Sequence, residues 1–161
     1  MTDGGADLDV RPMPRERLVE LLKLRWPGQN RFVCGRFITP ADVEGIGAFT
    51  GERLHGMATW MTHGRVMHVI AVNAFTELRA VGAGLLEAMI SRGREANMAL
   101  LRTTVSNDNV MGLRFYQRRG FRVTGLNHGI FDVMRQVNPS IPLTGFDGIP
   151  MRDEFELEFA L

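Results

Sequence analysis

Hydrophobic and polar positions near the N-terminus predict a short strand followed by a helix. Residues 8–11 alternate apolar and charged side chains, which is the period of a strand, and leucines recur at helical spacing within residues 15–26. Pro27 and Gly28 end this helix. The next apolar stretch, residues 32–38, is compatible with either a strand or an extended loop.

The middle of the chain predicts three antiparallel strands in series. Apolar-rich segments over residues 45–49, 54–61 and 66–72 are separated by short connections that contain Gly51 and Gly64. A glycine in a connection of this length is typical of a β-hairpin. We therefore expect a meander of neighbouring strands here.

From residue 73 the pattern changes to helices and strands in alternation. The glycine-rich stretch 79–84 predicts a turn, and apolar residues at helical spacing predict a helix over 85–97. The remaining elements are expected in the order strand, helix, strand, short helix and strand, over residues 100–105, 109–119, 121–126, 129–137 and 152–161. This order predicts a mixed α/β sheet layered with helices. Because no linker divides the chain, we expect a single domain over residues 1–161.

The composition excludes several classes of function. The chain has 161 residues, of which 45% are hydrophobic and 23% charged, as in an ordinary globular protein. Its 19 basic and 18 acidic residues leave a net charge of +1, which gives no basic face for nucleic acid. No apolar run approaches the ~20 residues of a membrane span. The acidic, glycine-rich N-terminus lacks the features of a secretory signal, so we expect a cytoplasmic protein.

Metal and disulfide chemistry are not expected from the sequence. Cys34 is the only cysteine, so the chain can form no internal disulfide and no cysteine-based zinc site. The four histidines do not show the spacing of metal ligands. We therefore expect no metal cofactor.

The glycine-rich stretch before the predicted helix is the first candidate for chemistry. Backbone N–H groups in the first turn of a helix lack internal partners and attract anions. Gly82 and Gly84 would let a phosphate approach the main chain closely, although an ordinary glycine-rich turn explains them equally well. The stretch matches no Walker A loop, and Glu87 stands where a dinucleotide fingerprint has its third glycine.

A second motif follows one strand later, at the start of the next predicted helix. It consists of Asn109, Gly112, Phe115, Tyr116, Gly120 and Phe121. It resembles the N-x-x-A-x-x-F/L-Y-x-x-x-G-F motif of the GNAT superfamily of N-acetyltransferases, with Gly112 at the alanine position. Arg79, Gly82 and Gly84 match the pyrophosphate motif Q/R-x-x-G-x-G/A of the same superfamily. The likeness covers roughly residues 32–161 and is closest to a bacterial subgroup whose substrate is not established.

The resemblance implies a fold and an acetyl-CoA site. The fold would be a mixed, mostly antiparallel twisted sheet with flanking helices and a splayed central strand pair, here residues 66–73 and 100–106. The pantetheine arm would lie between these two strands, and the pyrophosphate on the glycine motif. The residues that this assigns to cofactor binding are Ile70, Ala71, Val72, Arg79, Ala80, Val81, Gly82, Ala83, Gly84, Leu85, Asn109 and Tyr116. Many members carry a basic residue where this chain has Val81, so the affinity for the cofactor would be modest.

The resemblance also implies a general acid and a general base. Tyr116, the only tyrosine, matches the residue that protonates the leaving thiolate in many members, although its ring could simply pack beside Phe115 and Phe121. His68 stands where the subgroup often has a glutamate that deprotonates the amine. A neutral imidazole suits that role at pH 7, while a structural histidine in a strand is the alternative.

Two further groups of residues have two interpretations each. Glu154, Glu156 and Glu158 share one face of the last predicted strand, either as a solvated face paired with arginines or as an acidic rim that attracts a cationic amine. Met57 and Trp60 belong to the core or line an acceptor pocket.

The function implied by these residues is an N-acetyltransferase that moves an acetyl group from acetyl-CoA to an amine. The amine would attack the thioester directly, and a backbone N–H in the splayed strand would polarise the thioester carbonyl. The acceptor would be a small-molecule or peptide amine, not nucleic acid or membrane, and a homodimer is left open. The alternative is a non-catalytic acyl-CoA-binding sensor or interaction module on the same fold.

Overall fold

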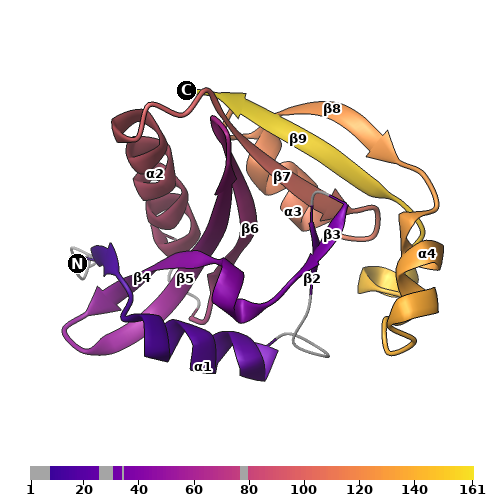
Figure 1. Ribbon diagram of the computed structural model, residues 1–161, viewed down its shortest axis with the longest axis horizontal. Coiled ribbons are helices and arrows are strands. Elements are labelled where there is room, and N and C mark those ends of the chain that lie inside the picture. The colour runs from indigo at the N-terminus through magenta and orange to yellow at the C-terminus, as the bar shows by residue number, and fades with distance from the viewer. Residues whose placement is uncertain (1–7, 26–30, 34, 77–79) are drawn as a thin grey trace, which may run out of the picture.

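The computed structural model describes residues 8–25, 31–33, 35–76 and 80–161 (Figure 1). Cys34 and Arg79 lie outside the described residues, as do Pro27 and Gly28. The strands are β1 (Asp9–Pro12), β2 (Arg31–Val33), β3 (Arg36–Ile38), β4 (Glu44–Thr50), β5 (Arg53–His63), β6 (Val66–Ala74), β7 (Leu100–Ser106), β8 (Arg122–Asn127) and β9 (Glu154–Ala160). The helices are α1 (Arg15–Arg25), α2 (Ala80–Glu95), α3 (Val110–Gln117) and α4 (Ile130–Val137), with 3-10 turns at Pro40–Asp42 and Phe146–Gly148.

One seven-stranded sheet organises the described part of the chain, in the strand order β1-β4-β5-β6-β7-β9-β8. Every neighbouring pair is antiparallel except β6–β7, which is parallel. The predicted mixed, mostly antiparallel sheet is therefore confirmed. The ambiguous stretch 32–38 forms a separate hairpin of β2 and β3.

Helices cover the two faces of the sheet, and each face has its own apolar core. On one face α2 buries Val81, Leu85 and Met89 against the sheet; on the other, α1 buries Leu18 and Leu22. Met57 and Trp60 are buried core residues, so the core interpretation of these two side chains is confirmed.

A glycine on each face allows its helix to lie close to the sheet. A Cβ on Gly45 would stand 2.8 Å from Leu18 Cδ1 of α1, and a Cβ on Gly56 would stand 2.4 Å from Val81 Cγ1 of α2. Side chains at these two positions would push the helices outward. The close approach of α2 fixes where its first turn lies relative to β5 and β6.

The parallel strands β6 and β7 separate half-way along their length. Their pairing begins at Val66 and Leu100 and ends at Val69 and Thr103, although both strands continue. Ile70 is the extra residue of a β-bulge in β6, because Thr59 pairs with Ala71 while Trp60 pairs with Val69. A bulge bends its strand and increases the local twist, which turns β6 away from β7. The expected splayed strand pair is present.

Two boundaries differ from those predicted. Helix α2 begins at Ala80, so the stretch predicted as a turn already belongs to the helix, and Gly82 and Gly84 lie in its first two turns. A glycine weakens a helix interior by only about 0.5–1 kcal/mol, which packing of the apolar face outweighs. Helix α3 begins at Val110, with Asn109 as its cap.

The prediction of a single domain over residues 1–161 stays a prediction. Among the described residues, no helix is both long enough and apolar enough to span a membrane. The same residues contain no group of three or more histidine, cysteine or acidic side chains placed to hold a metal ion.

Candidate functional site

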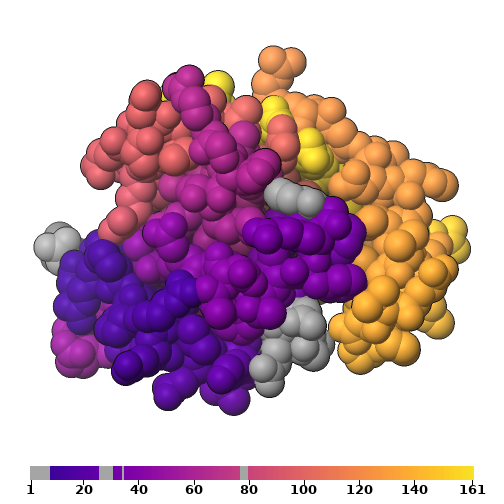
Figure 2. Space-filling view, viewed as in Figure 1, coloured from indigo at the N-terminus to yellow at the C-terminus, as the bar shows by residue number. Residues whose placement is uncertain are grey.

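A cleft of about 650 Å³ opens where β6 and β7 separate. Its floor is formed by residues of β6, β7 and β9, and its walls by the β2–β3 hairpin on one side and by α4 with the segment that follows it on the other. In the space-filling view the purple β2–β3 segment and the orange C-terminal segment lie next to each other across this region (Figure 2). Segments far apart in the sequence thus form one concave site.

Thr103 closes the narrow end of the cleft. Its hydroxyl donates a hydrogen bond of 3.1 Å to the carbonyl oxygen of Val69, at the last pair of the β6–β7 ladder. Beyond this point each strand is paired only on its outer side, β6 with β5 and β7 with β9. The two inner main-chain edges therefore face a common gap, and Ile70, Ala71 and Val72 lie on the β6 edge of it.

His68 lies in the floor of the cleft beside this narrow end. It is 6% exposed and lines the cleft, whereas its neighbours Met67 and Val69 pack in the core beneath α2. Burial is the main cause that lowers the pKa of His68 from 6.5, and the charges of Arg102 and His63 lower it further. The imidazole is therefore neutral at pH 7 and able to accept a proton.

Tyr116 lies behind the narrow end, on the α2 side of the sheet. Its ring makes edge contacts with Phe115 and Phe121 at centroid distances of 5.1 Å, and the residue is 7% exposed. Burial raises the pKa of the phenol to about 12, opposed by a hydrogen bond with the Thr103 side chain and by the charge of Arg31. The phenol is thus a packed core group that also reaches the cleft-lining residue Thr103.

Asn109 is the last residue of the loop between β7 and α3, and it caps helix α3. Its side-chain oxygen accepts a hydrogen bond of 2.8 Å from the amide of Gly112, and the residue also lines the cleft. A Cβ on Gly112 would stand 2.6 Å from Asn109 Nδ2. The glycine at the motif's usual alanine position therefore gives the capping carboxamide room to fold over the first turn.

The first turn of α2 carries the remaining residues assigned to the cofactor. The first described amides of α2 are those of Ala80, Val81 and Gly82, and those of Ala83, Gly84 and Leu85 follow further into the helix. Amides at the start of a helix are the ones open to a ligand. The side chains of Val81 and Leu85 are 0% exposed, so only their main chains could meet a ligand. A basic side chain at position 81 would be buried against Gly56, which explains why this chain carries valine there. Among the residues that the structure describes, none outside the backbone of α2 lies within 4 Å of a Cβ built on Gly84.

No protein-family model matches the chain. The protein YxbD of Bacillus subtilis, described as uncharacterized, is 25% identical over 146 residues, which cover 90% of this chain and 92% of that protein. The solved structure of an IAA acetyltransferase from Bacillus cereus superposes with a TM-score of 0.77 at 20% identity, covering 96% of this chain and 100% of that chain. A GNAT family acetyltransferase from Elizabethkingia anophelis, solved with acetyl-CoA bound, superposes with a TM-score of 0.71 at 16% identity, covering 96% and 99%.

The chain has the GNAT fold. The resemblance predicted from the two motifs is thereby confirmed at the level of the fold. The parallel β6–β7 pair is the splayed pair that the GNAT resemblance implied, and the glycine motif lies at the start of α2.

Two charged residues of this GNAT-fold cleft, Arg102 and Arg31, were not singled out as site residues from the sequence. Arg102 of β7 pairs with His68 in register, and its Nε donates a bond of 2.8 Å to Glu158 Oε1. Glu156 Oε1 lies 3.6 Å from the same nitrogen. Arg31 of β2 lines the cleft beside Glu154; burial of its guanidinium lowers its pKa, and the charges of Glu154 and Tyr116 oppose this shift.

The three glutamates of β9 have features of both interpretations given above, a face paired with arginines and an acidic rim of the site. Glu156 and Glu158 are paired with an arginine, and Glu154 and Glu156 line the cleft. Burial raises the pKa of the Glu154 carboxyl, while hydrogen bonds with Thr104 and Asn127 act against the rise. The alternation of β9 in the sequence places all three on one face, but it could not show that this face looks into a cleft.

Proposed function

We propose that the protein is an acetyl-CoA-dependent N-acetyltransferase in which the amine attacks the thioester directly. The observation that carries the proposal is the end of the β6–β7 pairing at Val69 and Thr103, with His68 in the cleft and Tyr116 behind Thr103. The gap between the two main-chain edges thus has a neutral base on its cleft side and a protonated phenol behind Thr103. The GNAT fold supports the assignment.

The main chain would hold the acetyl donor. The inner edge of β6 at Ile70–Val72 would pair with the amide groups of the pantetheine arm, as a strand pairs with an extended peptide. The amides of Ala80, Val81 and Gly82 would bind the pyrophosphate at the positive end of the α2 dipole. The empty space beside Gly84 allows the phosphates to lie against the helix.

His68 would accept the proton that the amine loses as its nitrogen bonds to the thioester carbon. A backbone N–H of the bulged β6 edge would stabilise the oxyanion of the tetrahedral intermediate. As the carbon–sulfur bond breaks, the Thr103 hydroxyl would turn from the Val69 carbonyl, give its proton to the leaving thiolate and take the proton of the Tyr116 phenol in its place. Burial raises the pKa of the phenol to about 12, so the phenol keeps its proton at neutral pH until the thiolate forms.

The test combines thiol release from acetyl-CoA with a matched variant. Tyr116→Phe should lower kcat by roughly 10²–10⁴, the usual contribution of a general acid, while the dissociation constant for acetyl-CoA stays unchanged. Phe keeps the ring contacts with Phe115 and Phe121, so the fold should persist. Full activity in Tyr116→Phe would remove the phenol from the mechanism.

One observation favours the second candidate function, an acyl-CoA sensor. Tyr116 is a buried core residue and reaches the cleft only through Thr103. A sensor would bind acetyl-CoA tightly and release no thiol with any amine, and Tyr116→Phe would leave this binding intact.

A further inference from the structure

The charges of the cleft floor and the apolar side chains of its walls also limit which class of amine can be the acceptor. This inference rests on the acetyl transfer proposed above. We propose that the acceptor is a small apolar monoamine, an alkylamine or arylalkylamine. Its ammonium group binds the Glu154 carboxylate and gives it one proton, so that the neutral nitrogen attacks the thioester and His68 takes the second proton, and its hydrocarbon part lies between the β2–β3 hairpin and α4.

Glu154 lines the cleft opposite Ser106 of β7, beyond the point where the β6–β7 pairing ends. The Glu154 carboxyl has a hydrogen bond with the Thr104 side chain and accepts one of 3.3 Å from Asn127 Nδ2. Thr104 is the first residue of β7 beyond the last β6–β7 pair, where the thioester would enter. The carboxylate therefore lies at the mouth of the gap and on the same face of the sheet as His68.

The charged side chains of the cleft floor leave one negative charge in excess, which one positive charge on the acceptor would neutralise. Arg102 faces two carboxylates, Glu156 and Glu158, and Arg31 lies beside Glu154. Among the described residues of this cluster, three carboxylates thus stand against two guanidinium groups. One ammonium group neutralises the excess, whereas the further charges of a polyamine would lie against the apolar walls without carboxylate partners.

The walls are apolar on both sides of this charged floor. Phe32 and Phe37 of the hairpin form an edge-to-face pair with centroids 5.2 Å apart, and both line the cleft. Phe131 and Met134 of α4 and Ile141 of the next segment line the opposite side. A hydrocarbon fits between these walls, whereas the hydroxyl groups of an aminoglycoside would lose their bonds to water there.

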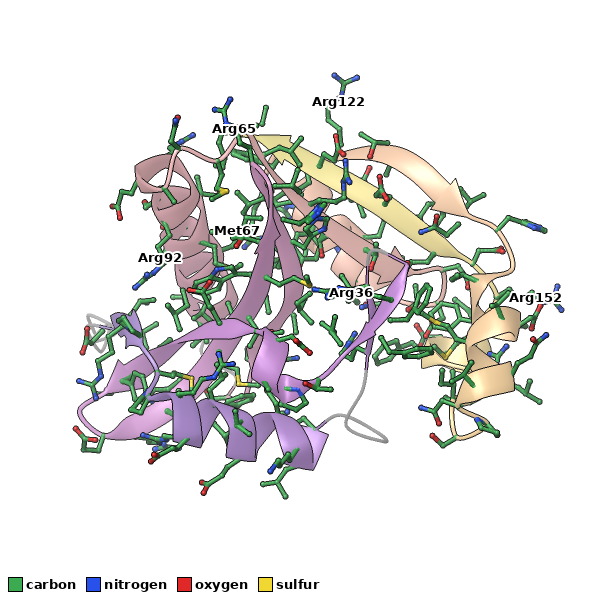
Figure 3. All side chains as sticks on the ribbon, viewed as in Figure 1. Arg36, Arg65, Met67, Arg92, Arg122 and Arg152 are labelled. Carbon is green, nitrogen blue, oxygen red and sulfur yellow. The ribbon has the colours of Figure 1, made fainter. Side chains whose placement is uncertain are left out.

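Other positive charges of the C-terminal part do not alter this balance. Arg122 and Arg152 project away from the molecule (Figure 3). Both side chains are exposed, and neither residue lines the cleft.

The first experiment measures thiol release with phenethylamine, hexylamine, spermidine and kanamycin at saturating acetyl-CoA. We expect kcat/KM for phenethylamine or hexylamine to exceed the other two at least ~10-fold. Spermidine or kanamycin as the best acceptor would overturn the inference and leave the acetyltransferase proposal standing. Calorimetric binding of phenethylamine without turnover would do the reverse: it would support the ligand class and overturn acetyl transfer.

Variants test the two parts of the site separately. Glu154→Gln should raise KM for phenethylamine roughly 10- to 100-fold, the loss of a charge-assisted hydrogen bond, while Glu95→Gln should not, because Glu95 is exposed on α2 and does not line the cleft. Phe37→Ala should lower kcat/KM for phenethylamine roughly tenfold, and Phe146→Ala should leave it unchanged. Phe37 and Phe146 are 42% and 62% exposed, so both variants should fold, and only Phe37 lines the cleft. Equal effects within either pair would refute the placement of the amine.

Discussion

The face of the sheet on which the His68 side chain lies is set by the alternation of strand β6 before the bulge at Ile70. Met67 and Val69 face the core beneath α2, so His68 faces the cleft. The sequence alternation predicted a strand here but could not say which face the histidine occupies. Because the face is set by the register between β5, β6 and β7, only the folded sheet could decide it.

The pH dependence of the reaction should report this histidine. Since burial and Arg102 lower the pKa of His68 below 6.5, kcat/KM should be constant near pH 7 and fall only at more acidic pH. His68→Gln should remove that acid limb and lower the plateau by roughly 10²–10⁴. Because burial raises the pKa of the Tyr116 phenol to about 12, the phenol should cause no alkaline loss at ordinary pH.

The control for this profile is His63→Gln, since His63 is exposed and does not line the cleft. Its charge lowers the pKa of His68, so its removal should shift the acid limb slightly upward and leave the plateau unchanged. The lowered pKa of His68 also makes the free energy of unfolding depend on pH. A folded-state pKa below the unfolded value of 6.5 contributes stability above that pH, which is lost as the pH falls through the lowered pKa. An acid limb that persists in His68→Gln would exclude the histidine as base.

At the scale of elements, strands were predictable and the boundaries around glycines were not. Alternation and glycine connections located the β4–β5–β6 meander, and the capping asparagine located α3. The start of α2 was predicted too late, because two glycines in a helix resemble a turn in the sequence. Their tolerance comes from tertiary contacts: α2 is held by Val81 and Leu85 in the core, and Gly82 lies against the Phe115 ring, 3.2 Å from the position of a Cβ.

Gly84→Ala separates the structural and the binding roles of this helix start. A Cβ at position 84 meets open space, so alanine should raise the free energy of unfolding by about 0.5–1 kcal/mol through its better helix propensity. The same methyl group would occupy the space proposed for the phosphates, so KM for acetyl-CoA should rise. Denaturant unfolding and initial-rate kinetics measure the two effects.

A matched control is Gly93→Ala, further along α2. Its Cβ would stand 2.6 Å from Leu161 Cδ1 and 3.2 Å from Cδ1 of the fully buried Leu101, so crowding should cancel the gain in helix propensity, without a specific effect on acetyl-CoA. If Gly84→Ala became more stable and kept its KM for acetyl-CoA, the phosphates would have to bind elsewhere.

At the scale of the whole molecule, the cleft joins the two ends of the chain. The β2–β3 hairpin comes from the N-terminal part, and α4 with the segment 138–151 from the C-terminal part. Asn107, in the loop after β7, holds the second wall: its side chain accepts bonds from the amides of Arg152 and Asp153 and donates one to the carbonyl of Pro150. No local pattern in the sequence indicates such contacts, since their partners are more than forty positions apart.

Arg135 of α4 also holds that wall, and its removal should raise KM for the acceptor but not for acetyl-CoA. Its guanidinium donates to the carbonyls of Pro142 at 2.7 Å, Met151 at 2.6 Å and Ile141 at 3.3 Å. Arg135→Ala should lower the free energy of unfolding by about 2–4 kcal/mol, because each lost bond costs about 0.5–1.5 kcal/mol. The loosened wall should raise KM for the amine, while KM for acetyl-CoA stays unchanged because α2 and the β6–β7 gap are untouched.

Arg152→Ala is the control for this variant, since the Arg152 side chain in the same segment points into solvent (Figure 3). A surface substitution of this kind should change stability by less than about 0.5 kcal/mol and leave both KM values alone. Steady-state kinetics with each substrate varied in turn, together with denaturant unfolding, give all the quantities. A parallel rise of both KM values in Arg135→Ala would show that the wall and the acetyl-CoA gap behave as one unit. An unchanged KM for the amine would show that α4 does not contact the acceptor.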